Sequence, residues 1–370
     1  MTSLVRKQIH NLRQLSTHRA DVGHQRLFIW GRGDSGQLGL GSSALESQGA
    51  FLFNDGVKRF WAGPNHFFAD DDRSAIWAWG RSDFLQTGVR GDKVFSPKKL
   101  TSEFLDTGRV KRTEENIRFT RGEEMPQVEH SILIHLIHPG ELGIACGEDY
   151  SVASIDGHGL FAFGRNDHGQ LGVEGEKMIP NPTRIDKISD KITKLSCGWG
   201  HTAGITERGD VWLWGSNRHS QCGRGEKTIK CPPVLLSKDT FGRSKVVQAD
   251  CGSGHVLYRT EDGGVWLSGS AADGKGITHT EDLLTPQRLP FFDELDSPVV
   301  STMSGVDHLG AMLENGEVYM WGFGQHGALG PALRKTIVIP QRIESSLLKG
   351  QTITRVYGSM DATIFLVSYQ

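Results

Sequence analysis

Gly198-Trp-Gly-His201 and, ten residues further on, Val211-Trp-Leu-Trp-Gly215 form the stretch that decides the fold of this chain. Both halves of the stretch recur. The aromatic segment that ends in glycine has six copies, Leu27–Gly31, Ile76–Gly80, Leu160–Gly164, Val211–Gly215, Val265–Gly269 and Val318–Gly322. The other half, a glycine followed three residues later by histidine or a substitute, occurs at Gly63/His66, Gly147/Tyr150, Gly198/His201, Gly252/His255, Gly305/His308 and Gly358/Asp361. Such repetition is the sequence signature of a repeat architecture.

The period of the repeat predicts its structure. From Tyr150 to Asp361 the histidine-type positions are separated by 51, 54, 53 and 53 residues. A third element, proline followed by a basic and an aliphatic residue, recurs in the same order at Pro97/Lys99/Leu100, Pro182/Arg184/Ile185, Pro286/Arg288/Leu289 and Pro340/Arg342/Ile343. Each period therefore holds several short β-segments, and one such unit cannot cover both of its apolar faces unless units stack radially. We expect an all-β chain that folds as a single β-propeller of four-stranded blades over residues 27–370, preceded by an N-terminal extension, residues 1–26.

The turns that follow the aromatic segments carry a family resemblance. Trp30-Gly31 precedes Asp34-Ser-Gly-Gln-Leu-Gly39, Phe163-Gly164 precedes Asp167-His-Gly-Gln-Leu-Gly172, and Trp321-Gly322 precedes Gln325-His-Gly-Ala-Leu-Gly330. Together with the Gly-x-x-His motif, these segments resemble the repeats of the regulator of chromosome condensation family over residues 27 to 368. The resemblance implies a propeller, usually of seven blades. Its members include a guanine-nucleotide exchange factor, accessory proteins of translation and tRNA modification, secretion regulators, mitochondrial proteins and ciliary scaffolds, so the fold alone does not fix an activity.

Two irregularities interrupt the repeat. The last repeat lacks an aromatic strand of its own, and we expect Leu27–Gly31 to join the C-terminal strands and close the ring. The second irregularity is the 84-residue interval from Gly80 to Gly164, whose excess includes residues 106–139. This segment holds two strand-like runs, 116–120 and 131–137, and is either a truncated seventh blade or a long insertion in a six-bladed ring. Direct counting gives six repeats, and we favour seven blades.

The composition excludes several classes of protein. The 370 residues include 41 Lys and Arg against 43 Asp and Glu, a formal net charge of −2, which lacks the cationic footprint that nucleic-acid binding requires. No apolar run is long enough for a membrane span, and no secretory signal is recognisable. The five cysteines then indicate free thiols in a reducing compartment. We expect a cytoplasmic or nuclear monomer, with mitochondria as the alternative because residues 1–20 hold four basic residues and no acid.

No residue set indicates catalysis, a cofactor or a metal. His66, His201, His255 and His308 occupy equivalent repeat positions, which favours satisfaction of backbone groups in tight turns over metal binding. Cys146, Cys197 and Cys251 all precede a repeat glycine and are expected to pack as small apolar residues. His219, Cys222 and Cys231 lack the paired spacing of a zinc site. Phosphate-binding and nucleophile-elbow motifs are missing as well.

Binding of proteins is therefore the function that the sequence favours. The first hypothesis is a non-catalytic adaptor or regulator, in a multiprotein complex for example. The alternatives are a guanine-nucleotide exchange factor for a small GTPase and an accessory subunit of tRNA modification or translation. Contact residues are expected where the repeat is broken, and they are Arg109, Lys111, Arg112, Arg118 and Arg121 in the irregular interval, and Trp61 and Trp199 beside glycine-histidine turns. Each group also has a purely structural explanation. The charged residues can form a solvated surface, and the two tryptophans can pack between blades.

Overall fold

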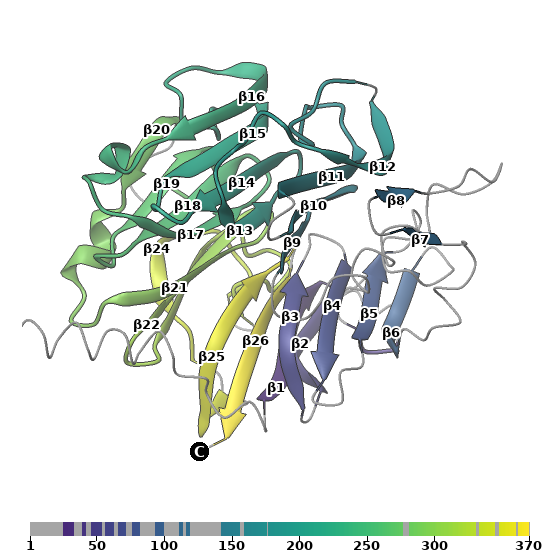
Figure 1. Ribbon diagram of the computed structural model, residues 1–370. Helices are drawn as coiled ribbons and strands as arrows, with labels where there is room; N and C mark the ends of the chain where they lie inside the picture. The colour runs from purple at the N-terminus through teal and green to yellow at the C-terminus, as the bar shows by residue number, and fades with distance from the viewer. Residues whose placement is uncertain are drawn as a thin grey trace, which may run out of the picture.

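The computed structural model describes a chain built from antiparallel four-stranded sheets (Figure 1). The described residues are 25–32, 39–41, 46–53, 56–62, 66–71, 76–81, 93–99, 111–113, 116–118, 142–155, 159–175, 177–276, 281–330, 333–344, 348–359 and 362–369. Six four-stranded sheets occur among them, and each contains one of the six aromatic strands. We number these sheets as blades 1 to 6 in their order along the chain.

The blades have these strands. Blade 1 consists of β25 (Gln351–Gly358), β26 (Ala362–Tyr369), β1 (Gln25–Arg32) and β2 (Glu46–Phe53). Blade 2 consists of β3 (Val57–Ala62), β4 (His66–Asp71), β5 (Ile76–Arg81) and β6 (Lys93–Lys99). Blade 3 consists of β9 (Leu142–Cys146), β10 (Tyr150–Ile155), β11 (Gly159–Arg165) and β12 (Met178–Arg184). Blade 4 consists of β13 (Ile192–Cys197), β14 (His201–Thr206), β15 (Val211–Asn217) and β16 (Thr228–Leu236). Blade 5 consists of β17 (Val246–Cys251), β18 (His255–Thr260), β19 (Val265–Gly269) and β20 (Leu283–Arg288). Blade 6 consists of β21 (Val299–Ser304), β22 (His308–Leu313), β23 (Val318–Gly322) and β24 (Ile337–Arg342).

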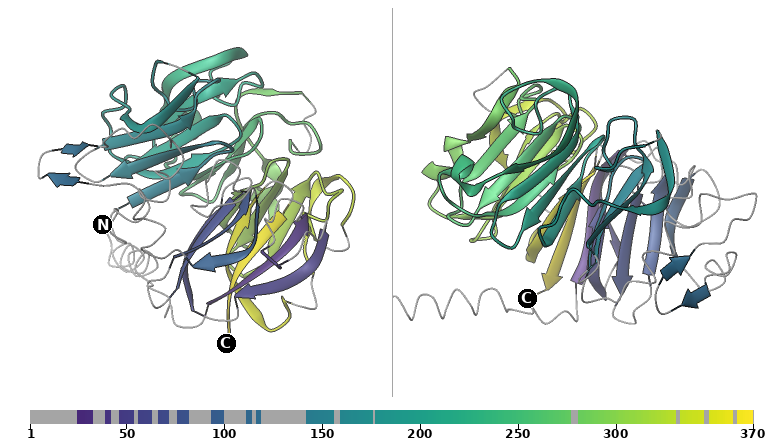
Figure 2. Two further views of the ribbon diagram at one scale, coloured as in Figure 1. Left: turned by 90° about the vertical axis from the view of Figure 1, so that its right-hand side faces the viewer. Right: turned by 45° about the horizontal axis from the view of Figure 1, so that its top comes forward.

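The first strand of each blade lies innermost. Contacts join β9 to β13, β13 to β17, β17 to β21 and β21 to β25, and β3 contacts both β1 and β9. Two short 3-10 helices, Lys238–Phe241 and Pro290–Glu294, follow the outer strands of blades 4 and 5. The sheets thus stand side by side around an axis, as the further views also show (Figure 2).

The N-terminal strand pairs with the C-terminal strands, as we expected. In the antiparallel ladder of β1 and β26, Gln25 lies opposite Ser368 and Gly31 lies opposite Ala362. Trp30 adds a link to blade 6, because its Nε1 donates a hydrogen bond to the carbonyl oxygen of Ala328 at 2.9 Å. Blade 1 is therefore made from both ends of the described chain. Closure of the whole ring also involves the irregular interval, so that part of the expectation stays a prediction.

Most of the irregular interval lies outside the described residues. Within it, β7 (Lys111–Thr113) and β8 (Asn116–Arg118) pair as a two-stranded antiparallel sheet. The expected run 116–120 is thus a described strand over its first three residues, and the expected run 131–137 lies outside the described part. A seventh blade stays a prediction.

Buried tryptophans join consecutive blades. Trp214 and Trp321 are 0% exposed, and Trp30 is 1% exposed. Their ring nitrogens donate to backbone oxygens of the preceding blade, Trp214 to Gln170 at 2.9 Å and Trp321 to Lys275 at 3.0 Å. A buried indole places large apolar area in the interface while its one donor is satisfied. This contact explains why the aromatic strand recurs.

The glycine that ends each aromatic strand is required by a close approach of two backbones. Gly215 has φ 103° and Gly269 has φ 90°, values that L side chains rarely adopt. A Cβ atom on Gly215 would lie 2.4 Å from the carbonyl oxygen of Gly200, and one on Gly269 would lie 2.3 Å from that of Gly254. No side chain fits between the strand end and the glycine-histidine turn.

Gly215→Ala should therefore destabilise the protein more than an alanine at an uncrowded glycine does. Gly316 is the matched control, because it has φ 85° and no atom within 4 Å of its Cβ position. Strain at positive φ alone costs about 1 kcal/mol. We expect Gly316→Ala to lower the free energy of unfolding in urea by this amount, and Gly215→Ala to lower it by at least about 3 kcal/mol, since the backbone must also move. Equal losses would contradict the close-approach argument.

Candidate functional site

One face of the propeller, which we call the turn face, collects two kinds of turn. In blade 4, His201 at the start of β14 lies opposite Gly215, near the end of β15, and blades 3, 5 and 6 repeat this register. The glycine-histidine turn and the turn after the aromatic strand therefore lie together. The outer strand also starts at this face, since Asn217 lies opposite Thr228.

Backbone hydrogen bonds run from one glycine-histidine turn to the next. The amide of Trp199 donates to the carbonyl oxygen of Gly252 at 3.1 Å, that of Ser253 to Val306 at 2.9 Å, and that of Val306 to Ser359 at 3.0 Å. Blades 4, 5, 6 and 1 are thus joined in sequence at the centre of the turn face.

The repeat histidines reinforce the same junctions. His201 donates through Nε2 to the carbonyl oxygen of His255 at 3.1 Å. Nε2 of His255 lies 2.7 Å from Ser304 Oγ, and Nε2 of His308 lies 3.1 Å from Thr363 Oγ1. Burial lowers the pKa of His201 and of His308 to about 4, so both rings are neutral at pH 7. The expected structural role is confirmed for His201, with the difference that the satisfied backbone group belongs to the neighbouring blade.

The cysteines also follow the sequence-based expectation. All five are buried with free thiols. Cys197 Sγ lies 3.5 Å from the carbonyl oxygen of Ala145, and Cys251 Sγ lies 3.5 Å from that of Ser196. His219, the third member of the zinc set that the spacing argued against, instead contacts Asp282, with 3.1 Å between Nδ1 and Oδ2. No group of three or more potential metal ligands occurs within the described ranges.

Trp199 is the large apolar side chain exposed at the centre of the turn face. It is 42% exposed although its backbone is fixed by the bond to blade 5. The following residue, Gly200, packs beneath blade 3, because a Cβ there would lie 3.0 Å from Cδ2 of His168. The turn that carries Trp199 is thus held by both neighbouring blades, and the indole is presented to solvent from a fixed backbone.

Exposed apolar side chains also lie around the periphery of this face. They occupy the first residues of the outer strands in four consecutive blades, namely Met178 (47% exposed), Ile229 (62%), Leu284 (42%), Val338 (47%) and Ile339 (63%). Two further exposed large hydrophobic residues in the described part, Leu235 and Val300, lie toward the opposite ends of their strands. Exposed apolar area is therefore concentrated on the turn face, which is typical of a protein-binding surface.

Charged groups of the turn face are paired, across blades 4 to 6 and within blade 3. Lys227 Nζ of blade 4 lies 2.6 Å from Asp282 Oδ2 of blade 5. The side chain of Lys275 is only 1% exposed, and its Nζ lies 3.1 Å from Asp307 Oδ1 of blade 6, an oxygen that also accepts from Ser253 Oγ at 2.8 Å. In blade 3, Arg165 binds Asp167 at 2.6 Å, and this hydrogen bond lowers the pKa of that carboxyl. The two pairs between blades hold neighbouring turns in register.

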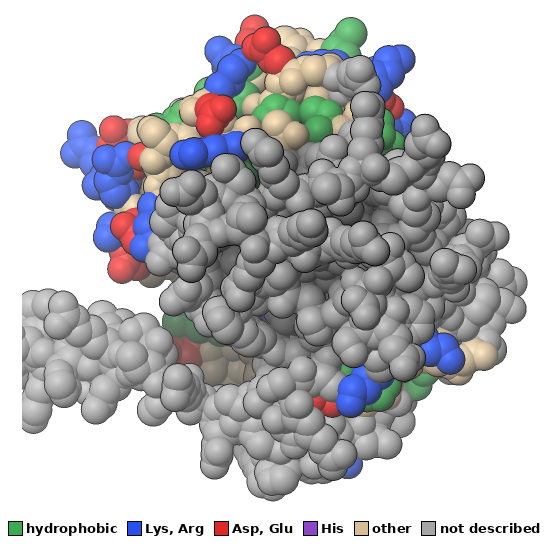
Figure 3. Space-filling view, turned by 45° about the vertical axis from the view of Figure 1, so that its right-hand side comes forward, with side chains coloured by type: hydrophobic (Ala, Val, Ile, Leu, Met, Phe, Trp, Pro, Cys, Tyr) green, Lys and Arg blue, Asp and Glu red, His purple; other side chains and the backbone are tan. Residues whose placement is uncertain are grey.

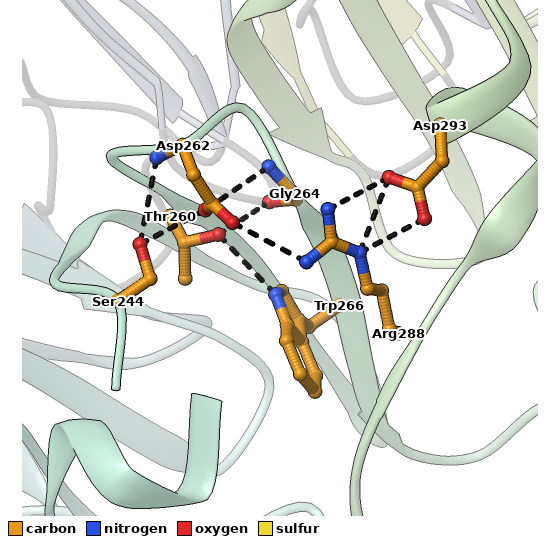
Figure 4. A network of polar contacts seen from close by, with 7 residues as sticks. All are labelled: Ser244, Thr260, Asp262, Gly264, Trp266, Arg288 and Asp293. Carbon is orange, nitrogen blue, oxygen red and sulfur yellow. Dashed lines mark hydrogen bonds and ion pairs between the residues drawn. The ribbon is translucent and has the colours of Figure 1, made fainter. Parts of the chain in front are cut away.

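On the opposite face, which we call the hairpin face, a polar network lies within a single blade. In blade 5, Arg288 binds Asp293 at 2.8 Å and Asp262 at 3.3 Å, and Trp266 Nε1 donates to Thr260 Oγ1 at 3.3 Å (Figure 4). This network ties the β18–β19 hairpin to the outer strand. In the space-filling view, Lys and Arg side chains lie beside Asp and Glu side chains along the described upper part of the surface (Figure 3).

The structure describes the sequence-predicted contact residues unevenly. Trp199 lies on the turn face. Trp61 belongs to the inner strand β3, and only the backbone of Trp61 is described. Lys111 and Arg112 belong to β7 and Arg118 to β8, again without described side chains, and Arg109 and Arg121 lie outside the described residues. Sequence reasoning missed the peripheral residues such as Ile229, because their strands read as ordinary repeat strands. The available signal was an apolar residue at the start of each outer strand.

Comparisons with known proteins agree with this architecture. The repeat described as "Regulator of chromosome condensation (RCC1) repeat" matches residues 158–205, 208–258 and 315–366, and a second description of the same repeat matches 192–221. The ultraviolet-B receptor UVR8 of Arabidopsis thaliana is 31% identical over 206 residues, which cover 55% of this chain and 46% of the receptor. The secretion-regulating guanine nucleotide exchange factor of Mus musculus is 28% identical over 296 residues, 77% of this chain and 56% of that protein.

A solved structure shows the same fold. Prp20p of Saccharomyces cerevisiae, described with its binding properties to Gsp1p and histones, superposes with a TM-score of 0.73 at 18% identity, over 95% of this chain and 93% of that chain. The chain spans about half the length of the two curated relatives named above. Within the described part, no helix is long and apolar enough to cross a membrane.

Acidification should destabilise the protein through the buried histidines. The folded-state pKa of His201 is about 4, against 6.5 for an exposed histidine, so the unfolded chain takes up the proton first. Stability is therefore complete above pH 6.5 and is lost as the pH falls toward 4, by about 2 kcal/mol per such histidine at pH 5. His201→Gln, whose amide retains a donor, should reduce the difference between the unfolding free energies at pH 7.5 and pH 5 by about that amount. An unchanged difference in urea titrations would show that His201 is not the group that titrates.

Proposed function

We propose that this chain, which belongs to the regulator of chromosome condensation family, is a protein-binding propeller that holds its partner on the turn face. The observation that carries the proposal is the exposed Trp199 at the centre of this face, together with exposed apolar residues on the outer strands of blades 3 to 6. Aromatic side chains near the centre of an interface contribute most of its binding energy. The paired charges fix the geometry of the turns and leave the apolar groups free to be covered.

Nucleotide exchange on a small GTPase is the second candidate for the same face. It is favoured by a relative that is named as a guanine nucleotide exchange factor and by the match to Prp20p, described with its binding to Gsp1p. An exchange factor needs no covalent chemistry, because it acts by binding the nucleotide-free GTPase better than the loaded form. A rigid apolar docking surface therefore serves an adaptor and an exchange factor equally, and the identity of the partner distinguishes them.

The irregular interval is a second proposed contact. Arg109, Lys111, Arg112, Arg118 and Arg121 interrupt the repeat, and binding elements are commonly located at such interruptions. A chain lacking residues 106–139 should bind its partner less well if these residues take part.

The compartment, cytoplasm or nucleus with mitochondria as the alternative, is tested by tagging the chain at its C-terminus with and without residues 1–26.

Trp199→Ala should abolish most partner binding without affecting the fold. Loss of a central aromatic contact costs about 2 kcal/mol or more, which corresponds to at least about thirtyfold in affinity. Leu235→Ala is the matched control, because Leu235 is 38% exposed near the hairpin face. Proteins captured from a lysate of the source organism should be retained by Leu235→Ala and lost by Trp199→Ala, with equal melting temperatures. Equal capture by both variants would exclude the turn face.

Capture in the presence of EDTA separates the two candidates. EDTA removes Mg²⁺ and empties GTPases, so an exchange factor should retain a small GTPase chiefly under this condition. The purified GTPase, loaded with a fluorescent GDP analogue, should then release it faster with the wild-type chain than with Trp199→Ala. A partner captured equally with and without EDTA would favour the adaptor. A captured GTPase whose nucleotide release does not change would exclude exchange.

A further inference from the structure

The inner strands line an open cavity of about 760 Å³ that the proposed partner site does not use. Its wall comes from β3, β13, β17, β21 and β25 of five blades. The wall extends from Gly252, Gly305 and Gly358 beside the turn face to Thr193 and Val300 toward the hairpin face. The cavity therefore lies along the axis, and its volume is within the range of about 300–1,000 Å³ that is usual for small-molecule sites.

The charged groups of the wall are unbalanced. Three cations, Lys194, Arg259 and Arg355, come from blades 4, 5 and 1, and Asp250 is the one carboxylate among the residues that line the cavity in the described part. The remaining lining residues are neutral. At neutral pH the wall therefore carries an excess of about two positive charges.

Asp250 does not neutralise these cations by direct pairing. Its Oδ2 accepts hydrogen bonds from Thr302 Oγ1 at 2.7 Å and from Gln248 Nε2 at 3.1 Å. Burial in the cavity wall raises the pKa of Asp250 to about 6, and the two hydrogen bonds, Arg259 and Lys194 oppose that rise. The Asp250 carboxylate is thus bound by neutral donors, Gln248 of its own blade 5 and Thr302 of blade 6.

Within the described ranges, Lys194, Arg259 and Arg355 form no ion pair with a carboxylate. Arg259 Nε is buried without a hydrogen-bond partner. Lys194 Nζ donates to the backbone oxygen of Val247 at 2.6 Å. Burial lowers the pKa of Lys194, and Arg259 and Arg355 lower it further while Asp250 opposes them, so Lys194 lies within electrostatic reach of both arginines. Lys194 and Arg355 are exposed and can be solvated, whereas the buried Nε of the half-buried Arg259 stays unsatisfied unless an anion binds it.

We propose that the axial cavity binds a small organic polyphosphate, whose anionic oxygens accept from Arg259, Lys194 and Arg355. Phosphate oxygens suit the fork of an arginine and accept several charge-assisted hydrogen bonds at once. Three cations on three different blades match a ligand with more than one phosphate group better than a single carboxylate. The ligand would offset the mutual repulsion of the cations and connect blades 1, 4 and 5 across the axis.

Inorganic triphosphate is the probe for this site, used with the intact chain in isothermal titration calorimetry at pH 7.5 and low salt. We expect saturable binding of one equivalent and a rise in melting temperature with ligand concentration. Arg259→Met and Arg355→Met should each weaken binding by about tenfold or more, the loss expected for one charge-assisted hydrogen bond. Asp250→Asn removes the opposing charge and should strengthen binding.

Lys238→Met is the control for general charge effects, because Lys238 is exposed in the 3-10 helix after blade 4 and does not line the cavity. This variant should bind triphosphate as the wild type does. If Arg259→Met fails to fold, the opposite effects of Arg355→Met and Asp250→Asn still test the site. The proposal is overturned if triphosphate neither binds nor shifts the melting temperature, or if Lys238→Met weakens binding as much as the cavity variants do. Partner capture by Trp199→Ala is independent of all these outcomes.

Discussion

The close approach between glycine-histidine turns is the constraint on which the rest of the structure depends. The turns of blades 4, 5 and 6 each donate a backbone hydrogen bond to the next blade, as Trp199 does to Gly252. The strand-end glycine Gly215 leaves room for the carbonyl of Gly200, and the buried imidazole of His201 closes the same junction. Since these contacts lie at one end of the blades, they fix the spacing of the inner strands and the exposure of the turn face together.

This constraint separates packing positions from binding positions. Tryptophans such as Trp214 are buried between blades, and the ring N–H donates a hydrogen bond to the turn of the neighbouring blade. These side chains are therefore unavailable to a partner. Trp199 is different, because its backbone belongs to the junction while its side chain is 42% exposed. Lys275, although charged, is buried and bound to Asp307, and so it acts as a cross-blade link. The turn face is therefore a rigid scaffold with an apolar surface.

The inner strands also contain both residues that join the blades and residues that are free to vary. Lys194, Gln248 and Ser301 each stand four residues before a repeat glycine, yet only Lys194 is charged. A repeat fold supplies equivalent positions around the axis, and substitution at one of them changes the charge of the shared cavity without changing the blade. The charge of the cavity wall can therefore change through a single substitution while the contacts between blades remain.

The sequence by itself determined the β-propeller, the six aromatic strands and the pairing of Leu27–Gly31 with the C-terminal strands, because these follow from local periodicity and from a strand that the last repeat lacks. It also gave the structural role of His201. Only the tertiary structure decided which residues are exposed together. Ile229 and Leu284 are 55 residues apart and reach one face through blade register, and Lys194, Arg259 and Arg355 converge on the axis from three blades. Such groupings depend on how the blades are stacked around the axis, which no local pattern specifies.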